Sequence, residues 1–106
     1  MTINTKAEGS KLTICLEGRL DTSSAPQLET ALKESLRGVT ELVMDFAELA
    51  YISSAGLRVL LSAMKLMKKQ GSMVVCNVNE TVMEVFEITG FADMLRTRLP
   101  FFAGFI

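Results

Sequence analysis

The stretch from Leu42 to Gln70 constrains the fold of this chain more than any other. An apolar run, Leu42 to Phe46, is typical of a buried strand, and an apolar pattern with helical spacing begins near Ala55. The stretch Tyr51-Ile52-Ser53-Ser54-Ala55-Gly56-Leu57 joins the two and contains the predicted start of the helix. In α/β folds such a helix start lies at the carboxyl edge of the sheet, where functional sites often form. A serine there can cap the helix by accepting a hydrogen bond from a free amide of its first turn.

The rest of the chain repeats this alternation of strands and helices. We therefore predict a single domain over residues 1–106, with an α/β fold: a mixed, mostly parallel sheet of four to five strands with helices packed on it. Ser24 and Gln27 predict a capping box at the start of the first helix, and Gly38 predicts its end. The predicted strands cover 2–7, 12–18, 41–46, 72–77 and 96–99, and the predicted helices cover 24–37, 55–70, 79–90 and, as a short helix or turn, 91–95.

Polar segments follow the predicted strands at one edge of the sheet. The run Leu42-Val43-Met44 indicates a central strand that is buried on both faces. Because parallel strands present their carboxyl ends at the same edge, we expect Asp21–Ser24, Ser53–Gly56 and Asn77–Glu80 to form one rim.

Composition excludes several classes of function. The 11 basic and 12 acidic residues give a net charge of −1, which argues against a non-specific nucleic-acid-binding protein. The chain has no histidine, so no Ser-His or Cys-His catalytic pair can form. Cys15 and Cys76 are too few for a zinc site and are expected to be reduced thiols. We expect no metal, no cofactor and no enzymatic activity.

The two ends of the sequence give two further expectations. The N-terminus has no apolar core of a signal peptide, and no apolar run is long enough to span a membrane, so we expect a cytoplasmic protein. The C-terminal tail, residues 100–106, carries four large apolar side chains. This tail either folds back over the sheet or forms a contact patch, for example in a homodimer.

Several motifs in their order and spacing resemble the STAS-domain family of anti-sigma factor antagonists, over residues 3–99. The motifs are Gly18-Arg19-Leu20-Asp21 followed by Ala25 and Leu28, Asp45-Phe46 with Leu49, Tyr51-Ile52-Ser53-Ser54-Ala55-Gly56-Leu57, Gly71-Ser72-Met73-Val74-Val75-Cys76, and Val85-Phe86 with Thr89-Gly90-Phe91.

The resemblance implies a partner-switching regulator. Such a protein binds an anti-sigma factor with serine kinase activity, leaves it when phosphorylated at the start of the second helix, and is reset by a serine phosphatase. The family pattern places the acceptor two positions before Gly56-Leu57, which selects Ser54, with Ser53 as the alternative. The implied partner-binding rim contains Asp21, Thr22, Ser23, Ser53, Ala55, Gly56 and Arg58.

Two other functions remain open from the sequence. The first is a constitutive STAS interaction platform in a stress-signalling or transport complex. The second is an enzyme with Ser54 as nucleophile, which the residues disfavour: Lys65 is more than about 15 Å along the helix, at about 1.5 Å per residue.

Overall fold

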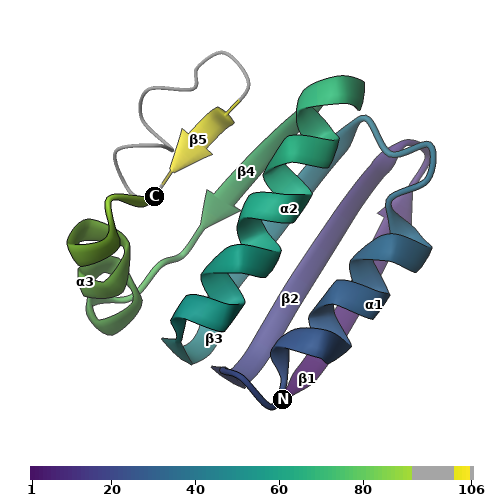
Figure 1. Ribbon diagram of the computed structural model, residues 1–106. Coiled ribbons are helices and arrows are strands. Elements are labelled where there is room, and N and C mark those ends of the chain that lie inside the picture. The colour runs from purple at the N-terminus through teal and green to yellow at the C-terminus, as the bar shows by residue number, and fades with distance from the viewer. Residues whose placement is uncertain (92–101, 106) are drawn as a thin grey trace.

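The computed structural model describes residues 1–91 and 102–105. Its sheet has five strands in the order β1-β2-β3-β4-β5, with β1 antiparallel to β2 and the other neighbours parallel (Figure 1). The predicted mixed, mostly parallel sheet is therefore confirmed. The strands are β1 (Thr2–Glu8), β2 (Lys11–Leu20), β3 (Glu41–Ile52), β4 (Ser72–Cys76) and β5 (Phe102–Phe105), and the helices are α1 (Ala25–Ser35), α2 (Ser54–Gln70) and α3 (Glu80–Thr89).

The first two strands form a hairpin. Glu8 pairs with Lys11, which leaves a two-residue loop in which Gly9 has φ +61°. Tight hairpin loops need such positive φ values, and glycine adopts them without a steric penalty. The hairpin aligns Ile3 with Leu16 and so starts the sheet at its β1 edge.

The helices α1 and α2 lie side by side over one face of the sheet (Figure 1). The strand residues below them are almost completely buried: Leu12, Ile14, Leu16, Leu42, Met44, Met73 and Val75 are at most 4% exposed. The helices cover these strand residues with Leu28 and Leu32 of α1 and with Leu60, Met64 and Met67 of α2. Each such side chain contributes about 1.5–3 kcal/mol when it leaves water, so this layer holds the fold together.

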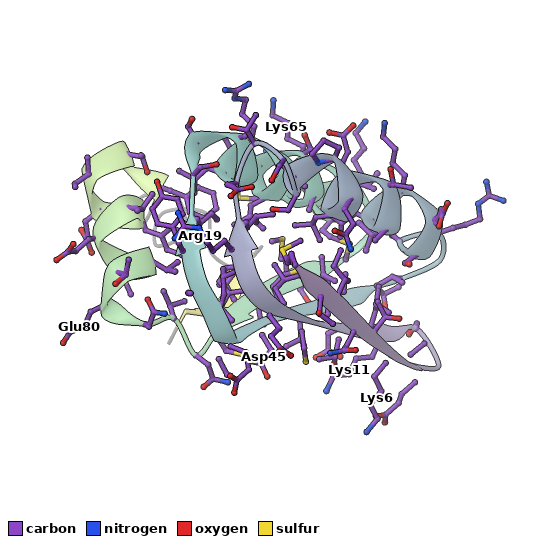
Figure 2. The ribbon with its side chains drawn as sticks, turned by 90° about the horizontal axis from the view of Figure 1, so that it is seen from below. Lys6, Lys11, Arg19, Asp45, Lys65 and Glu80 are labelled. Carbon is purple, nitrogen blue, oxygen red and sulfur yellow. The ribbon has the colours of Figure 1, made fainter. Side chains whose placement is uncertain are left out.

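The opposite face of the sheet is only half-buried, so the prediction that the central strand is buried on both faces is wrong. Val43 and Asp45 of β3 alternate with the buried residues and remain partly accessible to solvent. The physical reason is that both long helices pack on the same face. Figure 2 shows Lys6, Lys11 and Asp45 on the side of the sheet away from α1 and α2.

The strand β3 is longer than the sequence indicates, since it runs to Ile52 rather than to Phe46. Its second half pairs with the end of β2 after an irregularity in the register, and Leu49 and Ile52 are fully buried there. The turn predicted before Ser53 is therefore strand. This extension carries the start of α2 to the far end of β2.

The first helix ends earlier than predicted. It stops at Ser35, with Leu36 as its C-cap, and Gly38 lies in the following turn with φ +77°. The surface pair between Glu29 and Lys33 forms as expected from its i,i+4 spacing, with 3.1 Å between the carboxylate and the ammonium group.

The C-terminal tail contributes a strand. β5 runs parallel to β4, with Met73 opposite Phe102 and Val75 opposite Phe105. Residues 102–105 therefore fold back onto the sheet, at its edge and not over its face. Of the short helix or turn predicted at 91–95 only Phe91 is described, and the strand predicted at 96–99 lies wholly outside the described residues.

Candidate functional site

The ends of β2 and β3 bring two of the predicted polar segments together. Leu20 lies opposite Ile52, and the Ser53 amide donates a hydrogen bond to the Leu20 carbonyl, with 2.9 Å between nitrogen and oxygen. Asp21–Ser24 and Ser53–Gly56, which directly follow these strands, are consequently neighbours. We call these two segments together with Arg58 the rim.

The third predicted segment of the rim lies elsewhere. β4 ends at Cys76, opposite Asp45, and Asp45 stands seven residues before the end of β3. At about 3.3 Å per residue this is on the order of 20 Å along the strand. Asn77 donates to the Asp45 carboxylate at 3.0 Å, whereas Asn79 donates to the Leu49 carbonyl, three residues before the end of β3, at 2.7 Å. The prediction of one rim is therefore correct for two segments only: because β3 extends far past β4, the third segment begins away from them and approaches the strand ends only through Asn79.

The two serines at the start of α2 have different surroundings. Ser53 is the N-cap residue, in an extended conformation, and its hydroxyl oxygen is buried without a hydrogen-bond partner. Ser54 is the first helical residue and is exposed. The helix begins at Ser54, one residue earlier than predicted, and the side chain of the N-cap residue Ser53 makes no capping hydrogen bond. Ser54 therefore presents an exposed side chain at the N-terminus of a 17-residue helix, the end that carries partial positive charge.

The loop between β2 and α1 is ordered by its own side chains. The Asp21 carboxylate accepts from the Ser23 hydroxyl at 2.7 Å and from the Ser23 amide at 3.0 Å. These bonds, with weaker ones from Ser24, hold the pKa of the Asp21 carboxyl below its usual value, although partial desolvation opposes them. A fixed, ionised carboxylate therefore lies on the rim at neutral pH.

Ser24 does not form the predicted capping box. Its hydroxyl donates to the Arg19 carbonyl at 2.7 Å and accepts from the Asp21 amide at 2.9 Å, so it makes no bond to the first turn of α1. Ser24 is 8% exposed and ties the loop to the last residues of β2. The requirement for a partner at this buried position takes priority over the local capping pattern.

Gly56 lets α2 approach the strand ends closely. A Cβ atom at this position would lie 2.7 Å from Leu20 Cγ and 2.9 Å from Ile52 Cγ1. Both of these side chains are fully buried. The first turn of α2 therefore rests directly on β2 and β3, which fixes the position of Ser54.

Arg19 and Tyr51 adjoin the rim, although neither was among the site residues predicted from the sequence. They are paired across β2 and β3, the Arg19 guanidinium lies 4.5 Å from the centre of the Tyr51 ring, and its nitrogen lies 4.0 Å from the Asp21 carboxylate. Both residues stand one position before the end of their strands. No local signal in the sequence marks this pairing, because it depends on the extension of β3 past Phe46 and on its register with β2.

The other predicted rim residues are placed as follows. Thr22, Ser23 and Arg58 are exposed, Asp21 and Ala55 are half-buried, and Gly56 is buried in the contact just described. A hollow of about 350 Å³ adjoins the rim, and Thr22, Ala55 and Arg58 are among the residues that line it. Most of the rim is thus a solvent-accessible surface of small and polar side chains around Ser54.

The two cysteines lie away from the rim. They flank Asp45 in one row across β2, β3 and β4 on the half-buried face. Burial, reinforced by the Asp45 carboxylate, raises the pKa of both thiols. Within the described residues, no group of three or more histidine, cysteine or carboxylate side chains could hold a metal ion, and no helix is long and apolar enough to cross a bilayer.

Comparison with known proteins defines the class of this chain. Residues 2–103 match the STAS domain family, and the chain belongs to that family. BtrV of Bordetella bronchiseptica, which is named as a candidate anti-sigma factor antagonist, is 46% identical over 85 residues, or 78% of this chain and 73% of BtrV. The anti-sigma-B factor antagonist of Listeria monocytogenes is 31% identical over 88 residues, or 80% of this chain and 76% of the relative.

Solved structures show the same fold. The unphosphorylated form of the anti-sigma factor antagonist SpoIIAA superposes with a TM-score of 0.69 at 19% identity, over 91% of this chain and 99% of SpoIIAA. The phosphorylated form of the Bacillus cell fate determinant SpoIIAA gives a TM-score of 0.71 at 20% identity, over 97% of this chain and 90% of that one.

Proposed function

We propose that this protein, as a single STAS domain over residues 1–106, is an anti-sigma factor antagonist that works by partner switching. In its unphosphorylated form it binds an anti-sigma factor that is also a serine kinase, through the rim. Phosphorylation of Ser54 releases the partner, and a serine phosphatase restores the binding form. The exchange takes place in the cytoplasm, where sigma factors act.

The observation that carries this proposal is the contrast between the two serines. A kinase must reach the hydroxyl that it modifies, and Ser54 is exposed whereas the Ser53 oxygen is buried. The order of the motifs selects Ser54 as well, and its surroundings now supply a physical reason for that choice. The names of the BtrV and Listeria relatives support the same function.

The domain can carry a phosphate at this position without unfolding. Phosphoserine adds about −1.5 to −2 charges, which free amides at a helix N-terminus stabilise. Arg58 is four residues further along the same helix and provides a positive charge on the same side. SpoIIAA has this fold in both its phosphorylated and its unphosphorylated form, which supports a switch that alters the surface and keeps the fold.

The switch therefore acts on the interface. A partner surface that packs against a bare hydroxyl must make room for three phosphate oxygens that carry about −1.5 to −2 charges, on a rim that already holds the fixed Asp21 carboxylate. A loss of about 3 kcal/mol in binding free energy reduces affinity more than a hundredfold. The site supports binding and no chemical step of its own. The chain has no histidine to serve as a base, and the Asp21 carboxylate already accepts hydrogen bonds from Ser23 and Ser24.

The test measures affinity for the anti-sigma factor kinase encoded nearest to this gene. We expect Ser54→Ala to bind within a few-fold of wild type and Ser54→Asp to bind at least a hundredfold more weakly. Ser10→Asp adds the same charge in the β1–β2 turn, at the opposite end of the sheet, and is expected to bind like wild type. Equal binding by Ser54→Ala and Ser54→Asp would contradict the switch and favour a constitutive interaction platform.

A further inference from the structure

A groove runs along the outer surface between α1 and α2. The hollow of about 350 Å³ at the rim is followed by a second hollow of about 390 Å³, and the two share Glu29, Val59 and Ser62 in their linings. We call both hollows together the α1–α2 groove. Because they share residues, the groove is continuous with the rim.

The part of the groove that is distant from the rim has an apolar lining. Leu32 and Leu36 come from the α1 side, and Val59, Ala63 and Leu66 come from α2. Leu66 is 41% exposed, although a large apolar side chain on a helix is ordinarily turned inward. Among the described residues, Ile88 on α3 is the other exposed large apolar side chain, and it does not line this groove.

The length of the groove suits an extended contact. Ser54 and Leu66 are twelve residues apart on α2, which corresponds to about 18 Å along the helix at 1.5 Å per residue. This is the length of about three helical turns, enough for a row of side chains from one element of a partner.

The charge around the groove narrows the chemistry of that partner. The helix α2 contains no acidic residue, and Arg58, Lys65, Lys68 and Lys69 are all exposed on it. Figure 2 shows Lys65 extending from the helix layer away from the sheet. Of the charged residues that line the groove itself, Glu29 is paired with Lys33 at 3.1 Å, and Arg58 is the remaining charge, so the lining is basic on balance although the whole chain has a net charge of −1. An apolar row flanked by carboxylates complements it.

We infer that the α1–α2 groove is the second half of the partner interface. It binds a row of apolar side chains, flanked by acidic residues, on the same anti-sigma factor that the rim binds. This inference rests on the proposed function. Leu66, in the distant part of the groove, is about 18 Å along α2 from Ser54. Phosphorylation therefore disrupts the contact at the rim and leaves the contact at the groove available.

Two pairs of variants test the groove in binding measurements with the same anti-sigma factor kinase. Ser62 is exposed and lines both hollows, so Ser62→Trp fills the groove; Thr30→Trp places the same ring on α1, outside the groove lining. Leu66→Gln removes the exposed apolar side chain from the groove, and Ile88→Gln makes the same kind of change on α3. Thermal unfolding monitored by circular dichroism confirms that each variant is folded.

We expect Ser62→Trp and Leu66→Gln to weaken binding at least tenfold, with Thr30→Trp and Ile88→Gln within twofold of wild type. The inference is overturned if all four variants bind within twofold of wild type, or if the controls weaken binding as much as the groove variants. Ser54→Asp, measured alongside, separates the two claims. If it loses binding while the groove variants do not, the switch stands and the groove proposal fails; if it too binds like wild type, the proposed function fails.

Discussion

Replacing Gly56 by alanine is expected to destabilise the protein, although alanine is the better helix former. The substitution gains at most about 1 kcal/mol of helix propensity. The new Cβ, however, would lie within 3 Å of Leu20 Cγ, Leu20 Cδ2 and Ile52 Cγ1. Overpacking of a filled core costs about 1–3 kcal/mol, and the upper part of this range applies because Leu20 and Ile52 are fully buried at the ends of two paired strands.

The net effect is a loss of about 1–2 kcal/mol in the free energy of unfolding, from the difference between these two contributions. For a domain of this size it corresponds to a fall in Tm of about 5–15 °C. Urea unfolding and a thermal scan at neutral pH measure both quantities. A Gly56→Ala variant as stable as wild type, or more stable, would refute the close approach of α2 to the strand ends.

A double mutant locates the cause. Leu20→Ala removes two of the three side-chain atoms that the new Cβ meets, so Gly56→Ala should cost less in that background than in wild type. We expect a coupling free energy of at least about 1 kcal/mol between the two positions. Additive effects would mean that the destabilisation arises somewhere other than this contact.

Three further results follow from the structure. Gly71→Ala should reduce the free energy of unfolding by about 3 kcal/mol or more, because its Cβ would overlap the Thr40 carbonyl, which also accepts from the Ser72 amide; a chemical unfolding midpoint near wild type would contradict this. Asp21→Asn should be less stable than wild type at pH 7, and the difference in the free energy of unfolding should disappear as the pH falls below about 4. The reason is that a carboxyl with a lowered pKa stabilises the fold only while it is ionised. A difference that is independent of pH in urea titrations would be inconsistent with this. Cys15 and Cys76 should react with iodoacetamide more slowly in the folded protein than in urea at the same pH, because their raised pKa values leave less thiolate; equal rates, followed by mass spectrometry, would argue against it.

Much of the fold could be predicted from local patterns. Alternating apolar residues define β2, and the apolar stripe through Leu57, Leu60 and Met64 defines α2. The C-cap of α3 at Gly90, with φ +79°, was also predictable from the sequence. These elements are set by interactions between residues close together in the chain, which single-sequence reasoning can follow.

The features that the sequence did not reveal depend on contacts between distant segments. The second half of β3 forms because it pairs with the end of β2, although Ala47-Glu48-Leu49-Ala50 has no strand pattern of its own. Ser24 bonds to the Arg19 carbonyl instead of capping α1. The sheet has one half-buried face because α1 and α2 pack on the same side, which no local pattern specifies.

The candidate site shows the same division. The position of Ser54 at the start of α2 could be predicted, because the motif and the helical pattern coincide there. The buried environment of the Ser53 hydroxyl could not, since burial of a single atom depends on tertiary packing that no local pattern specifies. The stacking of Arg19 on Tyr51 likewise depends on the register between two strands.

The most direct test of the central claim is intact-mass spectrometry with site mapping, after incubation with ATP and the anti-sigma factor kinase encoded nearest to this gene. We predict a single added phosphate, located on Ser54, and none on the Ser54→Ala variant under the same conditions. A phosphate on Ser53, or no phosphate on either serine while the partner remains bound, would contradict the account.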